Sequence, residues 1–286
     1  MSALAASLRV DRLDTLRGEL RKLPAFLRRD FLVAWSYRLS FVTDALSLFV
    51  QVLVFAFVGK LIDPSVLPAY GGQSTSYVEF VAIGLPIAVF LQIGLGQVMG
   101  AIRNEQMQGT LESLLMTPTS PATVQIGSVV YDLVYVPVRT AVFLLLVALA
   151  FDADFHLAGA VPAIVLLLLF VPIIWGFGVA AAGVTLTFKR GGGLVAFAGT
   201  LLLFGSGTHF PLELLPQWVE SLAAVNPLAI VVEGMREALL GDGAWDTLAG
   251  DVARLIPMAA ASLAFGAIVF KLALRREKRL GTLGLY

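Results

Sequence analysis

The chain contains no cysteine and few charged residues, and each of these features excludes several classes of protein. Without cysteine, none of the 286 residues can contribute to a disulfide framework or supply a thiolate for metal or redox chemistry. Only 14% of the residues are charged, and 20 basic side chains balance 20 acidic ones, so net charge favours neither nucleic acid nor acidic ligands. The two histidines, His156 and His209, are solitary and have no carboxylate cluster at ligand spacing. We therefore expect no metal site.

Apolar residues, by contrast, dominate the sequence. They make up 58% of the chain, and the mean hydropathy of +0.86 lies on the apolar side of ordinary soluble domains. A helix needs about 20 mainly apolar residues to cross a bilayer, and six stretches qualify. The fifth is short and contains glycine. We predict an all-α polytopic membrane protein with spans at about 39–62, 78–102, 126–150, 160–187, 194–210 and 252–274.

The distribution of basic residues predicts the orientation of these spans. An even number of spans places both termini on one side, and that side receives most of the lysines and arginines. The opposite side keeps only Lys60, Arg236 and Arg254 and is rich in acidic residues. By the positive-inside rule, we expect both termini, including a basic tail at 275–286, to be cytoplasmic in a multi-pass protein of the cell membrane.

The first 38 residues have the pattern of a basic amphipathic helix. Leucines at 13, 16, 20 and 23 recur at helical spacing, and basic residues flank them. We expect this arm to lie in the membrane interface on the cytoplasmic side. Because basic residues run through the arm, we do not expect a cleaved secretory signal. The alternative is a solvated basic arm with incidental leucines.

A polar stretch, RNEQMQGTLESLLMTPTSP, joins the second and third spans at 103–121. Three of its leucines lie at positions i, i+3 and i+4 and predict one small apolar helix face. Gly109 permits a bend before this helix, Pro118 ends it, and Pro121 suits the first turn of the next helix. The stretch therefore predicts a short cytoplasmic helix that is attached to a span at each end.

Two segments resemble the membrane subunits of the ABC-2 (type V) exporter family. The run QMQGTLESLLMTPTSPATVQIG, at 106–127, is similar to the family's coupling-helix region. The run GTHFPLELLPQWVESLAAVNPLAIVVEGMREALLG, at 207–241, is similar to the segment that follows the family's fifth span. The resemblance implies a permease half-transporter, in which two membrane subunits form a pathway and two cytoplasmic ATPase subunits supply energy. The second membrane subunit would be another copy or a related permease.

In that arrangement the polar stretch is the coupling helix. The resemblance implies contact with the ATPase subunit at Glu105, Gly109, Thr110, Leu111, Glu112, Leu114, Leu115, Thr117 and Pro118. The chain has no G-x-x-x-x-G-K-[ST] phosphate loop, because GGGLVAFAGT at 191–200 lacks the Lys-Ser/Thr ending. We therefore expect the chain not to be an enzyme by itself and to bind no cofactor, with ATP and Mg on the partner subunit.

The segment 207–251 predicts two short amphipathic helices in the outer leaflet. Asn226 is a suitable N-cap, Pro227 suits the first helical position, and Gly241 ends the second helix. In the family such elements resemble a gate through which cargo leaves. The gate candidates are Phe210, Pro211, Glu213, Trp218 and Arg236.

A purely structural interpretation of the same segment remains open. Pro211 and Pro216 can simply shape a turn, and Trp218 can anchor the chain at the membrane–water interface. Glu233 and Glu237 can form solvated ion pairs with Arg236, and such pairs carry little energetic weight.

Three ionisable residues lie inside predicted spans: Asp44, Asp132 and Arg139. Charges at membrane depth are costly and usually have partners. These residues can contact substrate, or they can pair between helices or across a subunit interface, and Asp44 can hydrate at the cytoplasmic edge.

A strip of small residues in the fourth span contains Gly176, Gly178 and Gly183. Another helix can pack closely against it, either from a second subunit or from the same chain.

The predicted function is a permease subunit that moves an amphipathic drug-, lipid- or glycolipid-like substrate outward, and drug or lipid efflux is favoured over polysaccharide export. A secondary transporter is the main alternative, but 39–150 and 160–274 show no inverted repeat. A membrane-embedded enzyme would need convergent catalytic groups, whereas the polar residues here are dispersed.

Overall fold

The computed structural model describes residues 38–63, 66–107, 121–188, 191–241 and 245–280, together with five isolated helical positions between 24 and 36. Most of the predicted interface arm, the polar stretch from 108 to 120 and the last six residues lie outside this description. Nearly all of the described chain is helical, which confirms the predicted all-α class.

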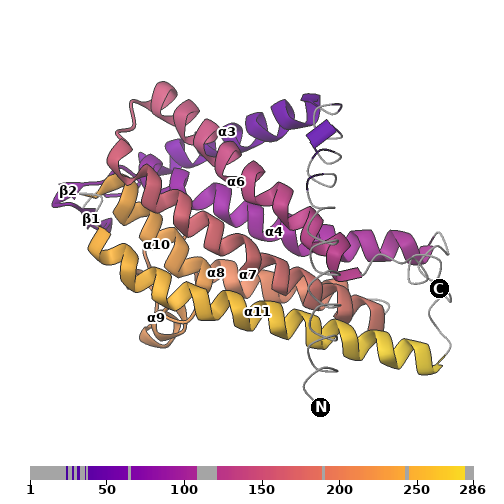
Figure 1. The fold of residues 1–286 in the computed structure, drawn as a ribbon. Coiled ribbons are helices and arrows are strands. Elements are labelled where there is room, and N and C mark those ends of the chain that lie inside the picture. Colours follow the sequence, from indigo (N-terminus) through magenta and orange to yellow (C-terminus); the bar gives the residue numbers. More distant parts are fainter. Residues whose placement is uncertain are drawn as a thin grey trace, which may run out of the picture.

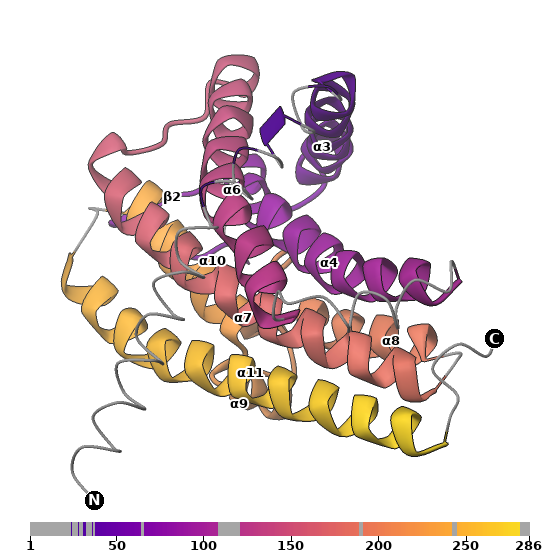
Figure 2. The same cartoon turned by 45° about the vertical axis from the view of Figure 1, so that its right-hand side comes forward.

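Among the described residues, five long helices and the shorter α8 form the bundle shown in Figure 1. They are α3 (Arg38–Gly59), α4 (Tyr77–Met107), α6 (Pro121–Phe151), α7 (Ala160–Thr187), α8 (Gly192–Phe204) and α11 (Trp245–Leu280). Helix α7 is central and contacts α4, α6, α8 and α11. Figure 2 shows α11 running along one side of α7, with α4 and α8 on another.

Shorter elements gather at one end of the bundle. They are β1 (Ala69–Tyr70), β2 (Gln73–Ser74), the 3-10 turns η2 (Leu157–Gly159) and η3 (Leu212–Leu214), and helices α9 (Gln217–Ala223) and α10 (Pro227–Leu240). The two strands form an antiparallel hairpin whose turn residues, Gly71 and Gly72, have φ angles of 56° and 74°. We call this end, which also carries the start of α4 and of α11, the hairpin end.

The described helices fit a polytopic membrane protein, but they do not confirm the predicted number of spans. Four described helices contain windows long and apolar enough to cross a bilayer, and these windows lie in α4, α6, α7 and α11. The pair α9 and α10, bent by 83°, would supply a fifth span if it crossed as one broken helix. The apolar part of α3, Leu46–Gly59, and helix α8 are shorter. A total of six spans therefore remains a prediction.

The fifth predicted span, 194–210, is too long. Helix α8 ends at Phe204, and residues 205–210 form turns instead. Gly205 is the C-cap, and Gly207 follows with a φ angle of 68°, in the left-handed region that favours glycine. At about 1.5 Å per residue, the 13 residues of α8 cannot cross a hydrocarbon core of about 30 Å.

Two glycines of the small-residue strip pack α7 closely against α11 of the same chain. A Cβ atom at Gly176 would collide with the backbone of Ser262, and one at Gly266 would collide with the carbonyl of Gly176. At Gly183 a Cβ atom would lie 3.0 Å from Cα of Phe270. Two positions of the strip therefore serve close packing within one chain.

Candidate functional site: a buried arginine beside an acidic cleft

Helix α10 begins with the cap that the sequence predicts. The side-chain oxygen of Asn226 accepts a hydrogen bond from the backbone N–H of Leu228 at 3.0 Å, and Pro227 occupies the first turn. The amide nitrogen of the same side chain donates to the carbonyls of Leu202 and Gly205, at 2.7 and 2.8 Å. Asn226 thus starts α10 and also fixes the end of α8 against it.

About one turn before α10 ends, Arg236 lies completely buried. Its Nε and Nη2 atoms donate to the carbonyl oxygen of Phe80 at 3.1 and 3.0 Å. Nη2 also donates to the carbonyls of Gly207 and Thr208 at 2.9 and 3.2 Å. The guanidinium carbon is 3.4 Å from the centre of the Phe80 ring, which adds a cation–π contact. One side chain therefore joins α10, the turn after α8 and the first turn of α4.

A carboxylate and a phenol complete the surroundings of this arginine. Nη1 of Arg236 is 3.5 Å from Oε2 of Glu233, and the hydroxyl of Tyr70 donates to Oε1 of Glu233 at 2.8 Å. Burial, followed by the nearby charge of Glu233, raises the pKa of Tyr70, so the phenol remains a proton donor. The network thereby extends to β1 of the hairpin.

The turn at 205–209 packs tightly on α4. A Cβ atom at Gly84 would lie 2.9 Å from Cγ2 of Thr208, so this close approach depends on glycine. The hydroxyl of Tyr77 donates to the carbonyl of His209 at 2.8 Å. The His209 ring lies 5.2 Å from that of Phe55, and burial lowers its pKa, which favours the neutral imidazole.

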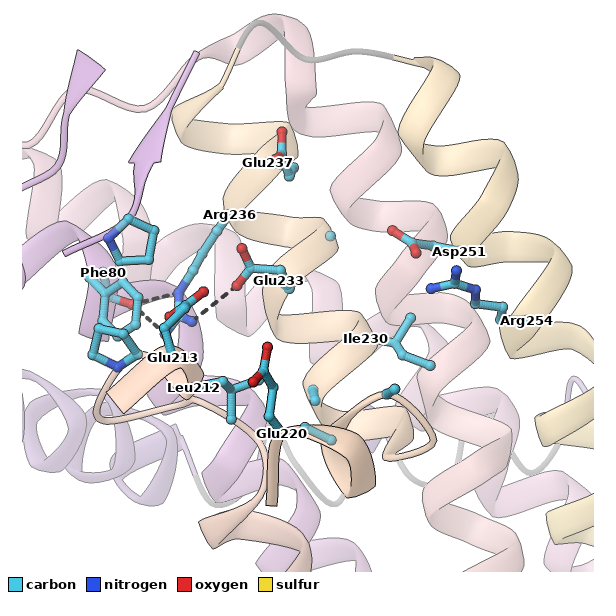
Figure 3. Close-up of a pocket in the computed structure, with 16 residues that line it drawn as sticks. Phe80, Leu212, Glu213, Glu220, Ile230, Glu233, Arg236, Glu237, Asp251 and Arg254 are labelled. Carbon is cyan, nitrogen blue, oxygen red and sulfur yellow. Dashed lines mark hydrogen bonds and ion pairs between the residues drawn. The ribbon is translucent and has the colours of Figure 1, made fainter. Parts of the chain in front are cut away.

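Beside the buried arginine is a half-open cleft of about 450 Å³, shown in Figure 3. Its rim is strongly acidic, and its walls are largely apolar. The charged lining residues are Glu213, Glu220, Glu233, Glu237 and Asp251, with Arg236 and Arg254 as the cations. The larger apolar lining residues are Phe80, Leu212 and Ile230. The cleft therefore combines apolar walls with seven charged side chains, five of them acidic.

The structure brings three of the five predicted gate residues together. Pro211, Glu213 and Arg236 line the cleft, whereas the Phe210 ring packs against that of Phe204 with a centroid distance of 5.6 Å. Trp218 is 66% exposed and does not line the cleft.

The interpretation of Arg236 as part of a solvated ion pair is wrong. Only 1% of its side chain is exposed, although 48% of the Glu233 side chain is. Sequence reasoning also missed Phe80 and Tyr70 as partners of this segment. No local pattern could have identified them, because Phe80 takes part through its backbone carbonyl and its ring, 156 residues from Arg236.

The other predicted functional residues are described only in part. Glu105 lies near the end of α4, and its side chain is outside the description, as are the coupling residues from Gly109 to Pro118. Asp44 and Asp132 lie on α3 and α6, with side chains that are likewise outside it. Arg139 is half-buried on α6, away from the residues that line the cleft.

Comparison with known proteins identifies the family of this chain. Residues 21–240, which include the buried arginine and most of the bundle, match the sequence model of the ABC-2 type transporter. The chain belongs to the ABC-2 type transporter family.

Two relatives of this ABC-2 chain carry the name "Probable multidrug ABC transporter permease YbhR", one from Escherichia coli strain K12 and one from Escherichia coli O157:H7. Each is 26% identical over 176 residues, which cover 59% of this chain and 46% of the relative. The chain thus matches about half the length of these relatives.

Proposed function

We propose that this chain is the membrane-spanning permease subunit of an ATP-binding-cassette exporter, driven by ATP hydrolysis on a separate cytoplasmic subunit. The observation that carries the proposal is the family match over 21–240. In the proposed complex, ATP and Mg bind to the partner subunit, and the permease works as a pair, either of two copies or of two related chains.

Helix α4 is suited to transmit motion in such a complex. Its first turn carries Phe80, which Arg236 holds, and its last residue is Met107, directly before the predicted coupling helix. At about 1.5 Å per residue, its 31 residues extend about 45 Å. A displacement at the coupling helix would therefore reach the hairpin end through one continuous element. Pro86 lies inside α4, six residues after Phe80, and offers a site for bending.

The hairpin end is proposed to face outward, with both termini in the cytoplasm and the chain in the cell membrane. The cleft beside Arg236 then opens at the exit side. Apolar walls with an acidic rim favour an amphipathic cargo of drug, lipid or glycolipid type. The E. coli relatives are named as probable multidrug permeases, which also favours a drug-like cargo.

The decisive experiment is reconstitution with the ATPase subunit. We expect the chain to co-purify with a nucleotide-binding subunit and to transport an amphipathic probe only when ATP is hydrolysed. Leu114→Asp should uncouple ATP hydrolysis from transport, because a charge would replace one leucine of the predicted contact. Full transport by this variant would remove the coupling assignment, and ATP-independent transport by the native chain would favour the secondary transporter.

A further inference from the structure

A second half-open cleft, of about 430 Å³, lies where the end of α3 meets the start of α4 and the end of α6. It is lined by residues from 53–60 and 76–78 and by Phe151, and we call it the α3 cleft. It shares no lining residue with the acidic cleft beside Arg236. Within the described part of the chain, Lys60 is the only charged residue that lines it. The two clefts therefore differ in the sign of their charge.

One face of α3 forms the long wall of the α3 cleft. The residues of this wall are Leu53, Ala56, Phe57 and Lys60, at intervals of three or four positions. Such spacing places them on the same side of the helix. At about 1.5 Å per residue, the wall extends about 10 Å along the helix from its lysine. Its first three residues belong to the apolar stretch Leu46–Gly59, so the wall is charged only where that stretch ends.

Aromatic rings form the other walls and fix the α3 cleft in the fold. The ring of Phe151, at the end of α6, packs against that of Phe49 on α3 with a centroid distance of 6.0 Å. On α4, the hydroxyl of Tyr77 donates to the carbonyl of His209 at 2.8 Å. A Cβ atom at Gly59 would lie 3.0 Å from Cδ1 of the Tyr77 ring, so α3 approaches α4 closely at that point. These contacts keep all three helices in place around the cleft.

The polar groups of the α3 cleft gather at the hairpin end. The ammonium of Lys60 lies 5.3 Å from the centre of the Phe57 ring and forms no ion pair with any residue that the structure describes. Ser76, directly before α4, is exposed, and its hydroxyl oxygen accepts from the N–H of Glu79 at 3.3 Å, which leaves the hydroxyl hydrogen to donate. The carboxylate of Glu79 accepts from the N–H groups of Ser76 and Asp154, at 2.9 and 3.2 Å. The rim of the cleft thus offers a cation and a hydroxyl donor.

A groove with donors at its rim and apolar walls below suits a molecule that is anionic at one end and apolar along its length. A phospholipid has this form, because its phosphate accepts charge-assisted hydrogen bonds and its acyl chain matches apolar side chains. A lysine that ends an apolar stretch also lies at the level of the lipid headgroups. Water suits the deeper part poorly, since the side chains of Leu53, Ala56 and Phe57 offer it no hydrogen-bond partner.

We propose that the α3 cleft binds one resident anionic phospholipid, with its phosphate at Lys60 and Ser76 and one acyl chain along Leu53 and Ala56. The lipid belongs to the leaflet at the hairpin end. The wall extends only about 10 Å from Lys60, about a third of a hydrocarbon core of about 30 Å, so the cleft holds a lipid of one leaflet and does not lead across the membrane. This inference goes beyond the proposed function, because it requires a membrane but no ATPase.

Photolabelling of the full-length chain in nanodiscs, with and without the ATPase subunit, tests the site. The nanodiscs would contain phosphatidylglycerol or phosphatidylcholine with a diazirine in the acyl chain, and peptide mass spectrometry would map the adducts. We expect adducts at 53–60 to be about fivefold more abundant with phosphatidylglycerol, the effect of one lysine near an anionic headgroup. At Phe265 and Ile268, exposed apolar residues of α11, the two lipids should label equally.

Two pairs of variants separate the contribution of the charge from that of the groove. Lys60→Met should remove the preference for phosphatidylglycerol, whereas Lys271→Met, at an exposed lysine near the far end of α11, should preserve it. Ala56→Phe fills the groove and should lower the adducts of both lipids at Val78 and Phe151 by at least fivefold. Ala260→Phe, at an exposed position of α11, is its matched control and should leave them unchanged.

Three results would overturn the proposal. One is the same ratio of the two lipids at 53–60 as at Phe265. Another is the absence of adducts in the α3 cleft while Phe265 is labelled, which would mean that protein covers the cleft. The third is the loss of adducts in the cleft during ATP hydrolysis, because the lipid would then be cargo and not resident.

The same preparation separates this inference from the proposed function. ATP-dependent transport by a chain without a lipid adduct in the α3 cleft would refute the lipid site alone. A phosphatidylglycerol preference that depends on Lys60, in a chain that binds no ATPase subunit, would refute the proposed function and support the lipid site.

Discussion

At the residue scale, Arg236 shows how a charge can be held inside a membrane protein. Its guanidinium has carbonyl acceptors from three residues, an aromatic face and a carboxylate around it. A planar group with five N–H donors suits such a set better than a lysine ammonium would. Burial without these partners would be costly, so the site depends on all of them together.

We predict that Arg236→Met lowers the free energy of unfolding by about 3–5 kcal/mol, because the carbonyls of Phe80, Gly207 and Thr208 lose their donors. Arg254→Met is the matched control, since Arg254 lines the same cleft but is exposed, and its effect should stay within about 0.5 kcal/mol. Unfolding in detergent, followed by tryptophan fluorescence, measures both. Equal losses in the two variants would contradict a special role for the buried arginine.

At the scale of elements, the pair α7 and α11 depends on glycines that face each other. Helices in a membrane gain little from hydrophobic burial against each other, so close backbone contact matters more. Gly176 and Gly266 provide that contact, while Gly250, also on α11, has nothing within 4 Å of where its Cβ atom would lie. The role of a glycine in this chain thus depends on which element lies opposite.

Two substitutions on α11 should therefore change the stability of the protein in opposite directions. Gly266→Ala forces the added methyl group against the carbonyl of Gly176 and should cost about 1–3 kcal/mol of stability. Gly250→Ala meets open space and should gain about 0.5–1 kcal/mol, because alanine favours the helix over glycine. Thermal unfolding midpoints in one detergent compare them. A lower unfolding midpoint in both variants would mean that helix packing does not distinguish the two positions.

At the scale of the whole molecule, the helices pack around α7, and short elements cover one end of the bundle. The hairpin, α9 and α10 close the hairpin end, and the Arg236 network links them to α4. The cysteine-free sequence makes the proposed orientation simple to test, since a single introduced thiol has no competitor.

We expect Ser74→Cys, at the exposed hairpin, to react with a membrane-impermeant maleimide in intact cells. Thr110→Cys, in the predicted coupling helix, should react only after the membrane is permeabilised. A protein gel with a mass-shifting label reads out both. Labelling of position 110 from outside would rule out contact with a cytoplasmic ATPase.

Sequence reasoning predicted what depends on neighbours along the chain. The start of α10 at Asn226 and Pro227 and the start of α6 at Pro121 follow from capping preferences that act within a few residues. The bounds of the fourth predicted span, 160–187, coincide with α7, because an uninterrupted apolar run defines them. The predicted end of the fifth span, at 210, lies beyond the end of its helix, because apolar character continues past Phe204 whereas the backbone turns at Gly205 and Gly207.

The sequence by itself determined that the protein is a helical membrane protein that resembles the ABC-2 family. The length of the apolar stretches, the distribution of basic residues and the motifs all depend only on the order of residues along the chain. Only the tertiary structure decided that Arg236 is buried, that Gly176 meets Gly266, and that Lys60 lines a cleft between three helices. Each of those outcomes depends on which helix lies opposite a residue. Such contacts join positions far apart in sequence, and helical periodicity indicates which residues share a face but not what that face meets.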